Sequence, residues 1–161
     1  MASISHQGPS GGTGGNFFDD FNDVIGGEGG AGFRASILQL QVNAGDTLDH
    51  LRVTYRAPGL PTDLGPVQHG DSNGGEVHPT FDIDLSSGER LQRIDGWIAN
   101  FDGTFEVRGL NFITNIRESG VLGATTNNSF TFEAPLGGEI VALLGRQGLF
   151  LDALGVYFRM A

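Results

Sequence analysis

The chain has 161 residues, 39% of them hydrophobic, which is enough to bury one core and to form a single domain over residues 1–161. Its formal charge is −10 and its nine basic residues include no lysine, so a phosphate backbone or an anionic lipid surface is a disfavoured partner. The absence of cysteine removes disulfides, thiolate nucleophiles and thiolate metal sites.

The N-terminal sequence carries no recognisable targeting signal. Residues 1–7 lack a basic region followed by an apolar region, and no apolar run approaches the roughly 18 residues of a membrane-spanning helix. We therefore expect a cytoplasmic protein without membrane insertion, and secretion by another route stays open. Residues 1–10 are expected to form a flexible N-terminal segment.

Alternation of apolar and polar residues predicts short strands with one buried and one exposed face. The glycine-rich residues 25–32, which precede these runs, are expected to form a long hairpin loop. Turn signals separate the runs, and no segment has a convincing helical stripe. In chain order, the predicted buried positions are Leu38, Leu40, Val42, Leu51, Val53, Tyr55, Phe81, Ile83, Leu85, Phe130, Phe132, Leu154, Val156 and Phe158.

Two segments of the chain share one pattern. Residues 45–55 and 148–158 have Gly, Leu, Asp, Leu and Val at equivalent positions, and each ends in an aromatic residue. A third copy can be aligned on residues 88–94, where Gln92 stands at the aspartate position. The chain is thus predicted to contain three related units, of which two keep a carboxylate.

The predicted fold is all-β. Many short amphipathic strands must bring their apolar faces together, and the threefold self-similarity favours three sheets around a pseudo-threefold axis with one shared core. A slip of one residue would turn the apolar face of a strand outward, so the register should be firmly set.

The spacing G-x-x-x-D at a turn that leads into a strand suits ligand binding. The glycine lets the backbone approach a ligand, while the backbone N–H groups of the turn and the carboxylate of Asp49 or Asp152 can converge on neighbouring hydroxyls. Each aspartate also has a matching Gly-Gly pair elsewhere, at residues 14–15 and 74–75. The alternative is that each carboxylate only caps its own turn.

Other motifs have weaker functional interpretations. Residues 27–32 satisfy G-x-G-x-x-G, but alternating residues follow instead of a helix, which argues against a nucleotide site. The acids at 82 and 84 lack the glycine position and the final acid of a calcium loop. The four histidines have no ligand spacing and are expected at the surface. No metal and no cofactor are predicted.

The segments 11–20, 110–115 and 145–157 together resemble the jacalin-related lectins, and the similarity extends from about residue 11 to residue 158. The resemblance implies a β-prism I fold with three four-stranded Greek-key sheets, in agreement with the threefold pattern. It also implies a non-catalytic lectin that binds a hexose.

The resemblance assigns a role to each residue of a first sugar site. Gly15 would lie beside the sugar, and the turn that begins at Gly148 would present the backbone N–H groups of Leu149 and Phe150 to sugar oxygens. The carboxylate of Asp152 would accept hydrogen bonds from two hydroxyls of the hexose.

A second site is implied by resemblance to the two-site members of the family. There Asp46, Thr47 and Asp49 would do the same work facing Gly74 and Gly75. Residues 71–73 of the adjacent loop depart from the glycine-rich sequence of similar lectins, and this difference distinguishes the second site from the first.

The resemblance also points to the ligand class. Galactose-specific members are cleaved at the glycine equivalent to Gly15, whereas here 14 residues precede it and no processing site is evident. This favours the uncleaved branch, which binds glycans containing mannose or glucose. One shallow site should bind a monosaccharide with about millimolar affinity, so avidity through a homo-oligomer, a dimer or tetramer, is expected.

Two alternatives from other classes stay open. A glycosidase would need two carboxyl groups facing each other across one bond, about 5 to 9.5 Å apart. An oligomeric scaffold would use the same fold without any ligand.

Overall fold

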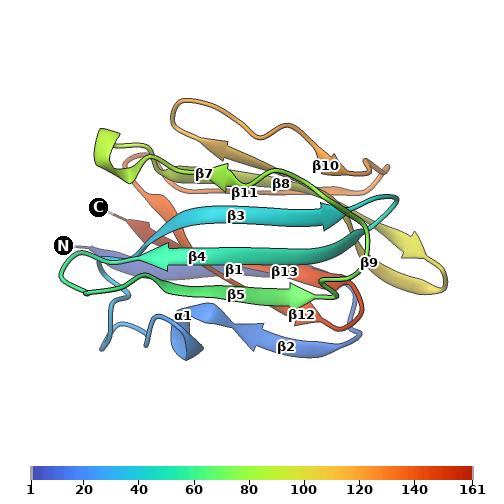
Figure 1. Ribbon diagram of the computed structural model, residues 1–161, viewed down its shortest axis with the longest axis horizontal. Coiled ribbons are helices and arrows are strands. Elements are labelled where there is room, and N and C mark those ends of the chain that lie inside the picture. Colours follow the sequence, from blue (N-terminus) through green and yellow to red (C-terminus); the bar gives the residue numbers. More distant parts are fainter. Residues whose placement is uncertain (1, 161) are drawn as a thin grey trace.

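The computed structural model describes residues 2–160, and Figure 1 shows an almost entirely β-structured molecule. Helical structure within this range is confined to the single turns α1 (Asp20–Asp23) and η1 (Leu85–Ser87). The strands are β1 (Ser3–Gly11), β2 (Asn16–Asp19), β3 (Ser36–Ala44), β4 (Leu48–Arg56), β5 (Leu64–Gly70), β6 (Glu76–Val77), β7 (Phe81–Asp82), β8 (Leu91–Phe101), β9 (Thr104–Thr114), β10 (Leu122–Gly123), β11 (Ser129–Glu133), β12 (Glu139–Gln147) and β13 (Leu151–Met160).

These strands form three antiparallel sheets, which confirms the predicted β-prism. The first sheet has the order β1-β13-β12-β2, the second β5-β4-β3-β6 and the third β10-β9-β8-β11. The second sheet differs slightly from a four-stranded sheet, because the short strands β6 and β7 both pair with β3. Each sheet is built around one long central hairpin: β12–β13, β3–β4 or β8–β9.

One apolar core lies between the three sheets. Alternate residues of the central strands enter it, because successive side chains of a strand point to opposite faces. Val53 on β4, Phe112 on β9 and Val156 on β13 are each fully buried, one from each sheet. A core shared in this way makes the sheets mutually dependent, since none can cover its apolar face alone.

A buried polar cluster joins the first and second sheets. The hydroxyl of Tyr55 donates to Asp20 at 2.7 Å and accepts from the backbone N–H of Leu143 at 3.2 Å. The ring of His69 lies 3.1 Å from the same carboxylate and stacks on Phe18 at 3.6 Å between centroids. The expectation of surface histidines is therefore wrong for His69, which is buried because a carboxylate and an aromatic ring accommodate it. It is also wrong for His50, which is buried beside the side-chain oxygen of Gln68 at 3.1 Å.

The N-terminal segment differs from the flexible stretch expected for residues 1–10. Residues 3–11 form β1, the edge strand of the first sheet, and pair antiparallel with β13 from Ser3 opposite Met160 to Gly11 opposite Ala153. The polar, glycine-containing sequence is ordered because the exposed edge of β13 supplies the partner for its backbone hydrogen bonds.

Residues 25–32 also differ from expectation, because they do not connect a hairpin. They follow α1, which Asp19 caps by accepting from the backbone N–H of Asn22 at 3.2 Å, and they lead from the first sheet to β3 of the second. Backbone hydrogen bonds fold the segment into compact turns, and Ile25 and Ala31 are buried in the core. Among residues 2–160, no helix has the length and apolarity needed to cross a bilayer.

The third repeat unit lies elsewhere than predicted. Residues 88–94 lead into β8, and Leu91 pairs with Thr114 at the end of the sheet remote from the hairpin turn. The hairpin equivalent to β3–β4 and β12–β13 is β8–β9. In that hairpin the strand pairing shifts by one residue, so that Arg108 has no partner on the opposite strand. Corresponding shifts leave Asp49 and Asp152 unpaired in the other two hairpins. Arg108 therefore occupies the third aspartate position, and the alignment on Gln92 is wrong.

The shared core predicts the effect of placing a charge on it. Val53→Asp or Val156→Asp should unfold the domain, because an unpaired buried carboxylate costs about 4 kcal/mol or more, a large part of the stability of a domain of this size. Thr54→Asp, at the half-buried neighbouring position on the other face of β4, is the matched control. Urea unfolding followed by circular dichroism checks this, and a core variant as stable as the control would contradict the shared core.

Candidate functional site

The turns that carry the predicted site residues lie at one end of the prism, on the right in Figure 1. They connect β1 to β2, β12 to β13, β3 to β4 and β5 to β6. The two carboxylates of interest, Asp49 and Asp152, each occupy a bulge at the start of the second strand of a hairpin. A bulge redirects the side chain of the extra residue, and here it faces a Gly-Gly turn of the same sheet.

The first site is a carboxylate packed against backbone. A Cβ atom on Gly14 would lie 3.1 Å from Oδ1 of Asp152, and one on Gly15 would lie 2.7 Å from Oδ2. Gly15 also has a φ of +66°, which other residues adopt at a cost. Gly148 approaches from the other side, where a Cβ would be 3.9 Å from Oδ2. The structure thus brings Gly15, Gly148 and Asp152 together, and Asp152 is largely buried among them, with 4% of its surface exposed.

The oxygens of Asp152 do not cap their own turn. Within residues 2–160 no hydrogen bond from the protein to either carboxylate oxygen is present, and the turn is closed by the backbone N–H of Gly148 donating to the carbonyl of Phe150 at 3.0 Å. Burial raises the pKa of Asp152 above its usual value, and the nearby guanidinium of Arg146 opposes that rise. The carboxylate is therefore left with acceptor capacity for an external donor.

Two backbone donors lie beside this carboxylate. In the described part of the chain, the N–H groups of Leu149 and Phe150 have no acceptor, and Leu149 is 72% exposed. The ring of Phe150 is held by an edge contact with Phe101, at 5.8 Å between centroids. Free donors and a free carboxylate on one short turn give a small polar surface that complements vicinal hydroxyls.

Arg146 holds the Gly-Gly turn in place. Its Nε donates to the carbonyl of Gly14 and its Nη2 to the carbonyl of Gly15, both at 3.0 Å. Gly12 adds a backbone hydrogen bond to the carbonyl of Asp152 at 2.8 Å. The sequence alone does not indicate this role for Arg146, because its partners are backbone carbonyls more than 100 residues away in the chain.

The second site repeats the geometry with more surrounding charge. Cβ atoms on Gly74 and Gly75 would lie 2.8 and 2.5 Å from the oxygens of Asp49. Burial raises the pKa of Asp49, and the neighbouring Asp71 raises it further. The backbone N–H of Asp71 donates to the carbonyl of Asp49 at 2.9 Å, and the Asp71 carboxylate accepts from the N–H of Asn73 at 2.9 Å. Residues 71–73, which differ from the glycine-rich loop of similar lectins, therefore form an ordered turn.

The other two predicted residues of this site lie differently. Asp46 is exposed at the tip of the β3–β4 turn. Thr47 is 3% exposed, and its hydroxyl donates to the buried carboxylate of Glu106 instead of pointing outward. The structure therefore groups Asp49 with Gly74 and Gly75, and leaves Thr47 only its backbone to offer a ligand.

Glu106 is a functional candidate that sequence analysis missed. It is fully buried on β9, and its Oε2 has no hydrogen-bond partner among the described residues. Burial raises the pKa of Glu106 to about 7, the hydroxyl of Thr47 opposes the rise, and the charges of Asp152 and Asp49 add to it. Glu106 therefore interacts electrostatically with the aspartates of both sites. Only the closing of three sheets on one another brings them together.

The β8–β9 hairpin supports the turns of both sites. Arg108, at the third aspartate position, donates through Nε to the carbonyl of Asp46 at 2.7 Å. Its guanidinium lies 4.9 Å from the ring centre of Phe101, which contacts Phe150 of the first site. Gln147 adds a further link, because its side-chain oxygen accepts from the N–H of Gly70 at 2.8 Å. The two sites therefore share one connected support.

Glu106→Gln tests the buried carboxyl. Since the pKa of Glu106 is raised from 4.5 to about 7, the folded state binds more protons than the unfolded state in that range, and the free energy of unfolding falls as the pH rises through it. Glutamine removes this proton uptake. Urea unfolding should therefore show that the free energy of unfolding falls between about pH 5 and pH 8. The fall should be larger for the unchanged protein than for the Glu106→Gln variant, by about 2 kcal/mol.

The matched control for this experiment is Glu133→Gln, since the Glu133 side chain is 63% exposed on the third sheet. This variant should keep the pH dependence of the unchanged protein. Identical pH dependence in the Glu106→Gln variant would contradict a proton held at Glu106 in the folded state.

The sequence is similar to those of known lectins. The family described as "Jacalin-like lectin domain" matches residues 7–157. An agglutinin from Castanea crenata is 32% identical over 155 residues, which cover 93% of this chain and 45% of the agglutinin. Jacalin-related lectin 3 from Arabidopsis thaliana is also 32% identical, and the chain spans 23% of it. The lectin Calsepa from Calystegia sepium is 26% identical, with 99% and 96% of the two chains covered.

Solved structures agree with the fold. Malaysian banana lectin superposes with a TM-score of 0.78 at 29% identity, covering 97% of this chain and 98% of its own. A mannose-binding jacalin-related lectin from Ananas comosus gives a TM-score of 0.77 at 29% identity, with 96% of each chain covered. The family match over nearly the whole chain and these superpositions show that this chain belongs to the jacalin-like lectin domain family.

Proposed function

We propose that this chain is a non-catalytic lectin domain that binds mannose- or glucose-containing glycans at the rim of its first sheet. The observation that carries the proposal is the Asp152 carboxylate. Its two oxygens face the Gly14–Gly15 turn without a protein donor, next to the free N–H groups of Leu149 and Phe150.

The chemistry of the site suits a hexose. Two adjacent hydroxyls of the sugar would donate to the two oxygens of Asp152, and such charge-assisted bonds are stronger than neutral ones. The N–H groups of Leu149 and Phe150 would donate to the ring oxygen and to an exocyclic oxygen. Because the turn is supported by Arg146 and Phe101, little ordering is needed when the sugar binds.

The names of several relatives support mannose as the ligand. The Ananas comosus structure is described as a mannose-binding lectin, artocarpin was solved with mannotriose, and a Parkia platycephala relative is a mannose/glucose-specific lectin. The artocarpin complex superposes with a TM-score of 0.78 at 26% identity.

The proposal places the chain in the uncleaved branch of the family. No processing site is evident in the sequence before Gly15, and Arg146 donates to the carbonyls of both Gly14 and Gly15, on either side of the bond that would be cut.

The second site is proposed as the weaker of the two. Asp49 has the same glycine contacts, but Asp71 places a second negative charge near it and Thr47 is turned into the protein. Two sites at one end of the prism could engage two arms of a branched glycan, which raises the apparent affinity without new contacts. A homo-oligomer, a dimer or a tetramer, would multiply the effect.

A glycosidase is the less favoured function. The Asp49 and Asp152 sites are built on different sheets, each against its own Gly-Gly turn. Glu106, whose pKa is raised to about 7, has no exposed surface from which to protonate a leaving group. Hydrolysis requires two carboxyl groups that face one bond, so one aspartate for each Gly-Gly turn favours binding over catalysis.

Calorimetric titration with methyl α-mannoside tests the proposal. The unchanged protein should bind with a dissociation constant on the order of 1 mM, equivalent to about 4 kcal/mol. Asp152→Ala should weaken the first site at least about tenfold, because both hydroxyl acceptors are lost. Asp49→Ala should remove the weaker binding that we assign to the second site. The Asp49→Ala, Asp152→Ala double variant should give no saturable heat.

Glu133→Ala is the matched control, since it removes the same charge from an exposed position on the third sheet. Its titration should equal that of the unchanged protein. Heat that survives unchanged in the folded double variant would overturn the proposed sites. Release of phenol from aryl mannosides above the level of the double variant would instead favour the glycosidase.

A further inference from the structure

A large pocket lies at the end of the prism opposite the candidate sugar sites, towards the left in Figure 1. It has a volume of about 970 Å³ and lies where β3 begins and β4 ends. The β4–β5 loop, η1 and the last residues of β13 complete its wall. None of these segments takes part in the loops around Asp49 or Asp152.

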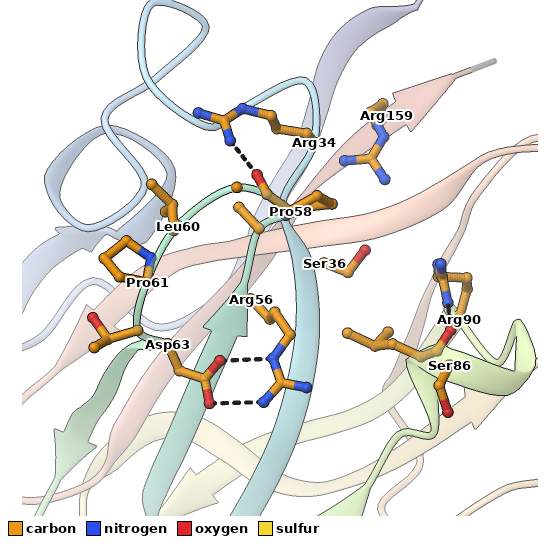
Figure 2. A pocket seen from close by; sticks show the side chains of 14 residues that line it. Arg34, Ser36, Arg56, Pro58, Leu60, Pro61, Asp63, Ser86, Arg90 and Arg159 are labelled. Atoms are coloured by element: carbon orange, nitrogen blue, oxygen red, sulfur yellow. Dashed lines mark hydrogen bonds and ion pairs between the residues drawn. The ribbon is translucent and has the colours of Figure 1, made fainter.

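Arginines dominate the polar lining of this pocket. Four of the nine basic residues of the chain line it, although the protein as a whole carries a charge of −10. Each comes from a different segment, and in Figure 2 they lie around Ser36. The four are Arg34, Arg56, Arg90 and Arg159.

Two carboxylates neutralise part of this charge. Asp63 forms a bidentate pair with Arg56, at 2.7 and 3.1 Å, visible in Figure 2. Glu139, at the edge of the pocket, accepts from Arg159 and lies 3.7 Å from Arg90. Four cations and two anions leave a net charge of +2 around the pocket, in a protein whose remaining surface is acidic.

Arg34 is the cation with the most unused capacity. Within residues 2–160 it forms no ion pair, and one N–H of its guanidinium donates to the carbonyl of Pro58. A guanidinium has five N–H donors in a planar fork, so Arg34 retains donors for an anionic group. The mutual repulsion of the four guanidinium groups would also fall if an anion entered the pocket.

The remaining lining combines the hydroxyl residues Ser36, Thr62 and Ser86 with apolar residues. Pro58, Leu60 and Pro61 of the β4–β5 loop form one side, and Leu85 of η1 contributes to the other. A volume of 970 Å³ far exceeds that of an inorganic anion and corresponds to a pocket for an organic molecule. Apolar walls with a few fixed donors fit a ligand that has an apolar body and an acidic group.

We propose that this pocket is a second kind of binding site, which takes a small organic anion with an apolar body and a phosphate, sulfate or carboxylate group. The anionic group binds Arg34, and the apolar body lies against Leu60 and Pro61 of the β4–β5 loop. Binding there is independent of the sugar sites, which lie at the other end of the prism.

Calorimetry with naphthalene probes tests this site. We expect saturable binding of 1-naphthyl phosphate, 1-naphthalenesulfonate or 1-naphthoate at low salt, with the preferred acidic group given by the strongest of the three. Neutral 1-naphthol should bind at least about tenfold more weakly than that probe. Affinity should fall as salt is added, because the site is partly exposed.

Arg34→Gln should weaken the preferred probe about tenfold, while Arg93→Gln, which removes the same charge from the third sheet, should leave it unchanged. Arg34→Lys should restore part of the affinity. Equal affinity in the Arg34→Gln and Arg93→Gln variants, equally tight binding of 1-naphthol, or no saturable heat with any of the three anions would overturn the proposal. Displacement of the probe by methyl α-mannoside would show that it occupies a sugar site instead, which also overturns it.

Circular dichroism and urea unfolding establish that the Arg34→Gln variant is folded. Its titration with methyl α-mannoside should match that of the unchanged protein. The probe experiment does not depend on sugar binding, so the anion pocket and the proposed lectin function can fail separately.

Discussion

The closing of three sheets on one apolar core is the constraint on which the rest of the structure depends. Each sheet contributes fully buried residues, such as Val53, Phe112 and Val156, that no other part of its own sheet could cover. Closure also gathers the turns of the three central hairpins at one end of the prism and the opposite ends of their strands at the other. The proposed sugar sites and the arginine-lined pocket are consequences of this separation, because each is assembled from segments that belong to different strands.

The same bulge occurs in all three central hairpins, but it carries different side chains. Asp49, Arg108 and Asp152 are the residues that the register skips at equivalent positions. In two copies the skipped side chain is a carboxylate facing a Gly-Gly turn, where it can accept from a ligand. In the third it is a guanidinium that donates to the backbone of the neighbouring turn at Asp46. The third copy thus supports the other two.

Charge is distributed unevenly in this acidic protein, and the distribution has a physical effect on both ends. At the sugar end, Glu106 is fully buried near Asp49 and Asp152, so it holds its proton up to about pH 7 and limits the negative charge between the sites. At the other end, Arg34, Arg56, Arg90 and Arg159 form a cationic region with only partial compensation. The cationic end would attract small organic anions, whereas the acidic end would repel them and accept neutral sugars.

The sequence by itself determined the strand character of the chain and the two related segments that carry Asp49 and Asp152, because alternation and the G-x-x-x-D spacing are local properties of the chain. The grouping of Gly15 with Asp152 was implied by the resemblance to jacalin-related lectins. Only the tertiary structure decided that residues 3–11 form an edge strand, that Thr47 turns inward to Glu106, and that Arg108 is the third counterpart. These depend on partners many residues away, such as β13 for the first strand. Distant contacts leave no mark in a local pattern, and they arise when three sheets close around one core.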